Sequence, residues 1–159
     1  MTSNLYDPLS RKTDDITSKL NSTSFNSEIF TKGTQITPEI YYTRNDSNGG
    51  HLRLRGKSIM NNSEAFYKPW NDRMEEWVLK GEITKVSVDF DYFNLSGSDC
   101  IEDLLKIFDK VLVYHPKITP QPSIDWYYNM DDEEMIESGE YCRRKMHVKF
   151  NLIEKISDN

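Results

Sequence analysis

The stretch from Ile83 to Leu112 constrains the fold most, because a strand pattern runs there directly into a helix pattern. Apolar residues from Val86 to Tyr92 alternate with polar residues, which is the period of a strand with one apolar and one polar face. Apolar residues between Cys100 and Leu112 then follow the three- and four-residue spacing of an amphipathic helix. The stretch therefore predicts a strand, a short polar loop over residues 94–98, and a helix.

The predicted loop carries the hydroxyl residues Ser96 and Ser98 beside Asn94. Ser98 or Asp99 is the expected N-cap of the helix, and Asp99 and Glu102 have the spacing of a capping box. Because the first amides of a helix favour an anion, a phosphoryl group on this loop would alter its hydrogen bonds and any surface docked on it. Ser96 and Ser98 fit a structural role as turn and cap residues as well.

Length and charge limit the function classes that the chain can belong to. Its 159 residues suffice for one domain, and its net charge of -6 argues against nucleic acid or an anionic membrane surface as the partner. No apolar run is long enough to cross a bilayer or to act as a secretion signal, so we expect a cytoplasmic protein. The two cysteines, Cys100 and Cys142, are too few for a disulfide framework or a zinc ligand set, which predicts reduced thiols.

Polarity divides the chain into a domain and two ends. Residues 1–35 are mostly polar and are predicted to form a flexible tail, residues 36–153 form the domain, and residues 154–159 form a C-terminal tail. Besides the central strand, alternation predicts four strands, near residues 38–43, 51–55, 124–128 and 146–152. Apolar spacing predicts a helix near residues 66–80, where Pro69 lies in the first turn or separates a short helix from a longer one. The acids from Asp131 to Glu134 predict the start of another helix.

About five strands interleaved with two or three helices predict an α/β domain with a single mixed sheet and helices mainly on one face. Ser87, Asp89 and Asp91 alternate with the apolar residues of the central strand. A sheet covered on both faces would show a continuous apolar strand at this place. We therefore expect the polar face of the sheet to meet water or a partner.

The residues predict no enzyme, cofactor or metal site. Asp89, Asp91 and Asp99 are a candidate set of ligands for a divalent cation, and a metal-dependent enzyme that uses them is one alternative, but a solvated sheet face explains them as well. The three histidines occur in unrelated sequence contexts without ligand spacing or a partnered nucleophile. No glycine-rich phosphate loop is present in the sequence.

Four segments, in order, resemble the SiaC family of bacterial regulatory phosphoproteins, whose fold is similar to that of anti-sigma-factor antagonist (STAS) domains. The second of them corresponds to a strand, a Gly-x-Ser turn and a helix of the family. Together they place the resemblance over residues 36–153. The segments are TPEI at residues 37–40, LRLRGKSIMNNSEAFY at 52–67, DYFNLSGSDCIEDLL at 91–105 and IDWYYNMDDEEMIESGEYC at 124–142.

The resemblance implies a non-enzymatic adaptor in a partner-switching system. A protein kinase phosphorylates the domain, a metal-dependent serine/threonine phosphatase reverses this, and the unmodified form binds and activates a diguanylate cyclase, which connects the switch to cyclic-di-GMP signalling and biofilm behaviour. In the family, the acceptor threonine follows the asparagine of a Tyr-x-Asn-Thr-Ser-Ser stretch. Here Tyr92-Phe93-Asn94-Leu95-Ser96-Gly97 places Leu95 at that position. Since leucine has no hydroxyl, either the acceptor has moved to Ser96 or Ser98, or the protein is a constitutively unphosphorylated interaction module.

We expect partner binding at the end of the central strand and the start of the following helix, over Tyr92, Asn94, Leu95, Ser96, Asp99 and Glu102. A structural interaction module that binds through residues 1–35 is a further alternative. The sequence leaves open whether the chain forms a homodimer through an unpaired sheet edge.

Overall fold

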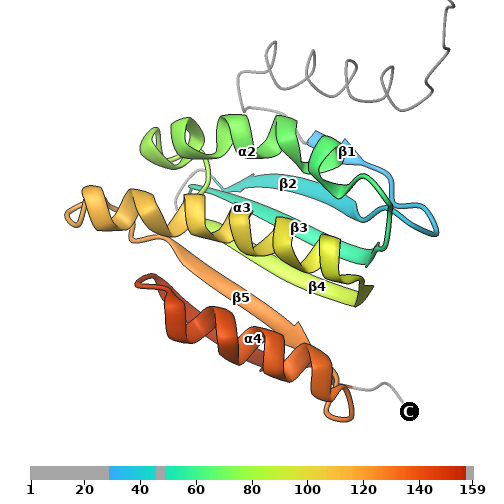
Figure 1. Ribbon diagram of the computed structural model, residues 1–159. Helices are drawn as coiled ribbons and strands as arrows, with labels where there is room; N and C mark the ends of the chain where they lie inside the picture. Colours follow the sequence, from blue (N-terminus) through green and yellow to red (C-terminus); the bar gives the residue numbers. More distant parts are fainter. Residues whose placement is uncertain (1–28, 46–48, 157–159) are drawn as a thin grey trace, which may run out of the picture.

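Six strands form one sheet in the computed structural model, which describes residues 29–45 and 49–156 (Figure 1). The strands are β1 (Ile29–Thr31), β2 (Glu39–Asn45), β3 (Gly49–Ser58), β4 (Lys85–Phe93), β5 (Ser123–Tyr128) and β6 (Lys149–Glu154). The helices of the described part are α2 (Ser63–Leu79), α3 (Leu95–Tyr114) and α4 (Glu133–Lys145). The predicted fold class, an α/β domain with a single mixed sheet and helices on one face, is confirmed.

The strands follow one another across the sheet in the order of the sequence. β1, β2 and β3 are antiparallel, whereas β3, β4, β5 and β6 run parallel, each joined to the next by a helix. Crossovers between parallel strands are almost always right-handed. Because each crossover here moves one strand in the same direction, all three helices lie on the same face of the sheet (Figure 1).

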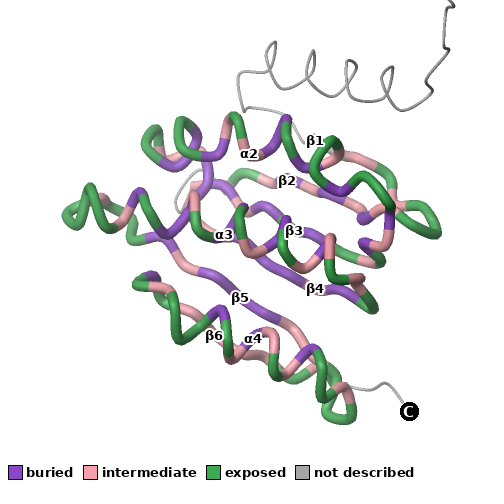
Figure 2. The backbone as a smooth tube through the Cα atoms, viewed as in Figure 1, coloured by how far each residue is buried: buried purple, intermediate pink, exposed green. Residues whose placement is uncertain are grey.

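The core lies between this helical face and the sheet, as the buried positions along the strands and the inner sides of the helices show (Figure 2). Trp70 and Met74 of α2, Leu104 and Phe108 of α3, and Trp126 of β5 are almost fully buried in it. Cys100 and Cys142 are buried free thiols. Within the described residues, no helix combines the length and the apolar character that crossing a membrane requires.

The structure differs from the sequence prediction at both ends of the domain. β1 lies inside the segment that we assigned to the tail and pairs with β2, while residues 1–28 of that segment lie outside the described residues. At the other end, β6 extends to Glu154, and the amide of Lys155 donates to the carbonyl of Tyr128 at 2.8 Å. The described chain is therefore ordered beyond the boundaries that composition indicated.

Pro69 neither starts nor interrupts a helix, contrary to both predicted alternatives, because α2 runs continuously past it. Proline cannot donate to the carbonyl four residues earlier, which here belongs to Ala65. Ala65 is exposed, so water is able to satisfy that carbonyl, whereas the proline ring itself is buried. Burial of the neighbouring Tyr67 and Trp70 favours the helix despite the missing hydrogen bond.

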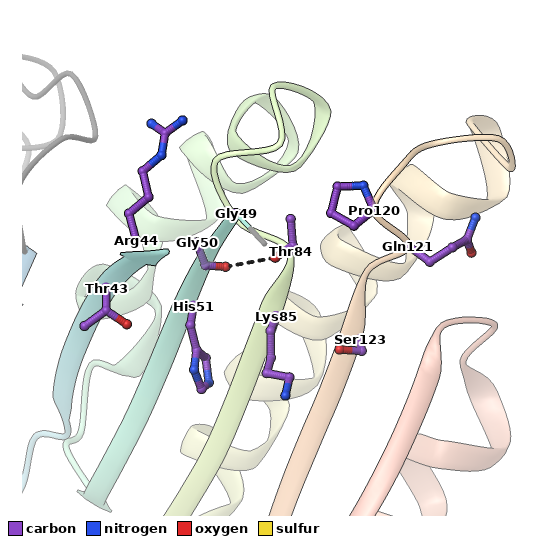
Figure 3. A pocket seen from close by; sticks show the side chains of 10 residues that line it. All are labelled: Thr43, Arg44, Gly49, Gly50, His51, Thr84, Lys85, Pro120, Gln121 and Ser123. Carbon is purple, nitrogen blue, oxygen red and sulfur yellow. Dashed lines mark hydrogen bonds between the residues drawn. The ribbon is translucent and has the colours of Figure 1, made fainter. Parts of the chain in front are cut away.

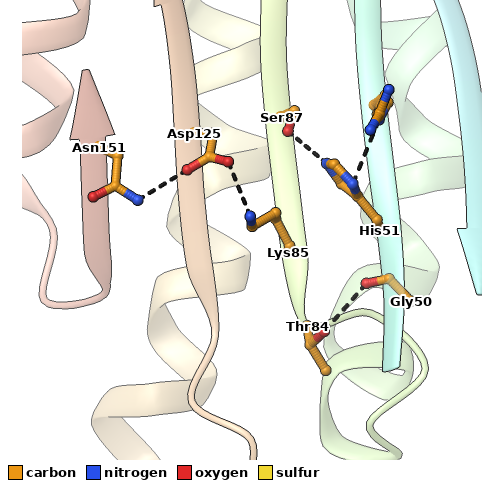
Figure 4. Close-up of polar contacts among 8 residues, drawn as sticks. Gly50, His51, Thr84, Lys85, Ser87, Asp125 and Asn151 are labelled. Carbon is orange, nitrogen blue, oxygen red and sulfur yellow. Dashed lines mark hydrogen bonds and ion pairs between the residues drawn. The ribbon is translucent and has the colours of Figure 1, made fainter. Parts of the chain in front are cut away.

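Two buried carboxylates fix the last parallel strand. Asp125 of β5 accepts a hydrogen bond from Asn151 of β6 at 2.9 Å and forms an ion pair with Lys85 of β4 at 3.1 Å (Figure 4). Asp109 of α3 accepts hydrogen bonds from the amides of His147 and Val148, at 2.6 and 2.7 Å. Such charge-assisted bonds are stronger than neutral ones, so they hold the entry to β6 against α3.

Candidate partner-binding site

The junction between β4 and α3, residues Tyr92 to Ser98, contains no loop of its own. β4 ends at Phe93 and α3 begins at Leu95, so Asn94 alone connects them. Its side-chain oxygen accepts from the amide of Gly97 at 2.8 Å, and its carbonyl accepts from the amide of Ser98 at 2.9 Å. Asn94 is therefore the N-cap, and the prediction of Ser98 or Asp99 was wrong because the helix starts at least four residues earlier than either cap would allow.

Ser58, at the end of β3, holds this junction in place. Its carbonyl accepts a hydrogen bond from the amide of Asn94 at 3.1 Å, and its hydroxyl shares one with Tyr67 of α2 at 2.8 Å. Gly97 packs directly on it, since a Cβ atom there would lie 2.4 Å from the Ser58 carbonyl oxygen. Ser58, Tyr67 and Gly97 are all buried, so the start of α3 is fixed to both β3 and α2.

A shift in the strand register turns Tyr92 outward. Gly56 of β3 pairs with Phe90, but Lys57 pairs with Tyr92, so the register skips Asp91. β3 therefore continues through Gly56, which has a φ of 94°, to Ser58, rather than ending at Gly56. The extra residue reverses the alternation, and Tyr92 is 52 % exposed instead of lying in the core as its spacing predicted.

The structure brings four of the six expected partner-binding residues together at the junction: Tyr92, Asn94, Leu95 and Ser96. Leu95, at the first helical position, is 80 % exposed. Ser96 and Ser98 are partly exposed, and the carboxylate of Asp99 has no ion-pair partner among the described residues. The amides of Leu95 and Ser96 likewise have no acceptor in the described part of the chain, as expected for the first positions of a helix.

Glu102 lies apart from this group and is engaged within the fold. One oxygen of its carboxylate lies 3.0 Å from the ammonium of Lys106 and 3.1 Å from that of Lys145 in α4. Partial burial raises the pKa of Glu102, but hydrogen bonds from Lys106 and Lys145 outweigh it, so the pKa lies below its ordinary value. The side chain thus connects α3 to α4 and is not free to bind a partner.

The three aspartates of the metal-dependent alternative do not form a metal site. Lys155 places its ammonium 2.6 Å from Asp89 and 3.9 Å from Asp91 on the polar face of the sheet. Asp99 belongs to α3, which covers the opposite face. No group of three His, Cys, Asp or Glu residues able to hold a metal ion occurs among the described residues.

A family model for the SiaC family regulatory phosphoprotein matches residues 31–155. The chain belongs to the SiaC family. Solved structures share its fold: SiaC of Pseudomonas aeruginosa has a TM-score of 0.65 at 22 % identity, over 81 % of this chain and 99 % of that one. SiaC from a crystal structure of the diguanylate cyclase SiaD in complex with its activator SiaC, also from Pseudomonas aeruginosa, has a TM-score of 0.66 at 21 % identity, over 80 % and 99 % of the two chains. No curated protein was found to match.

This SiaC-family domain also has a pocket of about 820 Å³ (Figure 3). It lies where β3, β4 and β5 begin, at the end of the sheet away from the β4–α3 junction. Arg44, His51 and Lys85 bring positive or titratable groups to it. The ammonium of Lys85 is neutralised by Asp125, and the backbone carbonyl of Gly50 accepts from the amide of Thr84 at 2.8 Å. The polar groups of the pocket are thus largely used within the fold.

His51 and Ser87 lie 2.5 Å apart, Nε2 to Oγ, but they do not form a catalytic pair (Figure 4). Arg53 donates to Nδ1 of His51 at 3.4 Å, so Nδ1 is an acceptor and the proton resides on Nε2. His51 therefore donates to Ser87 and is unable to take its proton. Ser87 is also buried, which sequence alternation did not predict and which excludes a substrate from its hydroxyl.

Replacing Gly97 with alanine should displace the start of α3. The new Cβ would lie within 3 Å of both the carbonyl oxygen and the hydroxyl oxygen of Ser58, so backbone must shift. We expect Gly97→Ala to lower the free energy of unfolding by about 1–3 kcal/mol. Chemical denaturation measures this, with Ser96→Ala as the control in the same turn. A Gly97→Ala protein as stable as the wild type would contradict the described contact.

Acid should destabilise the protein through His51. Burial lowers its pKa from 6.5 to about 4, with contributions in the same direction from Arg53 and Lys85 and an opposing one from Asp125. Between these two pH values the unfolded state binds more protons at this site, so its contribution to stability is present above pH 6.5 and is lost as the pH falls towards 4.

Denaturation curves over this pH range should therefore show a smaller pH dependence for His51→Gln than for the wild type. His115→Gln, at an exposed position, is the control and should keep the dependence of the wild type. Equal slopes for His51→Gln and the wild type would show that His51 is not held neutral by the fold.

Proposed function

We propose that this SiaC-family domain is a non-enzymatic signalling adaptor that binds and activates a diguanylate cyclase through the β4–α3 junction. Membership of a family of regulatory phosphoproteins supports the regulatory role. The description of Pseudomonas aeruginosa SiaC as an activator of the cyclase SiaD supports this class of partner. In this proposal the unmodified form is the one that binds.

The observation that carries the proposal is the exposure of Leu95 and Tyr92 on a rigid support. Both are large apolar residues, 80 % and 52 % exposed, at the position that the family uses for its switch. Ser58 holds the backbone beneath them through the amide of Asn94. A fixed apolar pair loses little entropy on binding, and tyrosine is among the residues that most often dominate an interface.

Within the proposal, Ser96 is the better of the two remaining phosphate acceptors. It is the second residue of α3, where the amides of Leu95 and Ser96 and the helix dipole favour an anion. Ser98 is the fourth residue of α3, past these amides, and its own amide already donates to the carbonyl of Asn94, so a phosphate there would gain less from the start of the helix. A phosphoryl group on Ser96 would add a charge of nearly −2 beside Leu95, so burying this surface would become costly.

Truncation of Leu95 should weaken cyclase binding. Leu95→Ala removes exposed apolar surface without disturbing the helix, and we expect the dissociation constant to rise by about tenfold or more. The matched control is Val113→Ala, at the other end of α3, where the side chain is 48 % exposed. Binding of each purified full-length diguanylate cyclase of the same bacterium, together with its rate of cyclic-di-GMP formation, provides the measurement. If no cyclase is bound or activated by the wild type, the proposed function is wrong.

Phosphosite mapping on protein isolated from its native cells, with phosphatase inhibitors present, decides between the two accounts of Leu95. We expect phosphate on Ser96, and we expect it to disappear in Ser96→Ala while Ser98→Ala retains it. Phosphate on Ser98 alone would contradict the electrostatic argument. A junction without phosphate under every growth condition would favour the constitutively unphosphorylated module, with no role for a kinase or phosphatase.

A further inference from the structure

The parallel strands of the sheet all end at one edge, which we call the carboxyl edge. α2, α3 and α4 each begin there, because each follows one of these strands (Figure 1). The loop between β1 and β2 reaches the same edge, since Glu39 at the start of β2 pairs with Arg55 near the end of β3. The β4–α3 junction is thus one part of the carboxyl edge.

Exposed apolar side chains gather along this edge beyond the junction. Met130, in the turn between β5 and α4, is 76 % exposed. Ile36 is half exposed, and its carbonyl accepts from the amide of Ile59 at 2.9 Å, next to Ser58. With Tyr92 and Leu95, these residues place apolar surface at the ends of three neighbouring strands, β3, β4 and β5. Exposed apolar residues grouped at one end of a domain mark interaction sites more often than residues scattered singly over the surface do.

The charges around these residues have one dominant sign. Lys32, Arg55 and Lys57 are the exposed cations of this edge; Arg55 lies 4.0 Å from Glu39, and the half-buried Lys155 is paired with Asp89. Exposed carboxylates outnumber them; they are Glu64, Asp99, Asp131, Glu133, Glu134 and Glu154. More exposed cations lie towards the other ends of the helices, where Lys80, Arg143 and Lys145 are in ion pairs; they are Lys80, Lys110, Lys117, Arg143, Arg144 and Lys145. The acidic edge therefore selects a partner by charge as well as by apolar contact.

We propose that the docking surface extends along the carboxyl edge from Ile36 through Tyr92 and Leu95 to Met130, and that it takes a protein surface with an apolar centre and a rim of lysine and arginine. This inference rests on the proposed function and names the chemistry that the cyclase must present. A second copy of the same chain is disfavoured, because the acidic edges of two copies repel each other and contact with the basic end would form an open chain rather than a closed dimer.

Truncation of Met130 tests the extent of the surface. Met130→Ala should raise the dissociation constant for the cyclase by about fivefold or more, whereas Leu79→Ala, an exposed apolar residue at the end of α2, should leave it unchanged. Thermal melts establish that each variant is folded. If Leu95→Ala weakens binding but Met130→Ala does not, the contact is confined to the β4–α3 junction; the extended surface is then wrong while the proposed function stands.

Charge reversal on α4 tests the chemistry of the partner. The double variant Glu133→Lys, Glu134→Lys at the start of the helix should slow association about threefold or more, and Arg143→Glu, Arg144→Glu at its end should not. Raising the salt from about 50 to about 500 mM should slow wild-type association and affect the Glu133 and Glu134 variant less. An association rate that changes neither with this charge reversal nor with salt would show that the partner surface has no basic rim. Sedimentation tests whether the wild type associates with itself. If it does, and if Met130→Ala abolishes this, a second copy of the chain occupies the surface and the proposal is wrong.

Discussion

The hydrogen bond from the amide of Asn94 to the carbonyl of Ser58 connects the parts of this domain on which the site depends. Ser58 ends β3, Asn94 caps α3, and the Ser58 hydroxyl meets Tyr67 of α2. A buried carbonyl that lost this amide would have no water to replace it, and the same holds for the Ser58 hydroxyl. The position of Leu95 is therefore set by the core and not by a flexible loop, which makes a small exposed surface suitable for specific binding.

The order of the strands determines where such a surface can arise. Because β3 to β6 run parallel and a helix follows each of the first three, these four strands end, and the three helices of the described residues begin, at the carboxyl edge. Helix starts favour acids and helix ends favour bases, as α4 shows with Glu133 and Glu134 at one end and Arg143 to Lys145 at the other. In α4 these local preferences place acids at the carboxyl edge and bases at the other end of the domain. A partner attracted to the acidic end meets the exposed apolar residues there.

Periodicity predicted the central strand, the buried stripe of α3 and, apart from the buried Ser87, the polar face of the sheet, because each depends only on the spacing of apolar residues. It failed where a single contact decides the outcome. The skipped pairing at Asp91 turned Tyr92 outward, and no pattern within β4 reveals a register with β3. Ser96, Gly97 and Ser98 have the composition of a turn, yet Asn94 caps the helix before them. The importance of Ser58 was present only as the Gly-x-Ser element of the family resemblance, since its role depends on residues far away in the sequence.

Leucine and threonine at position 95 would affect partner binding in different ways. A threonine at the first position of α3 would carry its phosphate next to the free amides of the helix, where charge on the surface opposes burial. Leucine instead adds apolar area to the surface whose burial a phosphate would oppose. It should therefore favour the bound state whether or not the protein is phosphorylated elsewhere. Ser96 is one residue away on the same turn. A phosphate there would still add charge to the same contact. Under the proposed function, leucine in place of threonine would therefore change the affinity of the unmodified state without by itself removing the means of switching it.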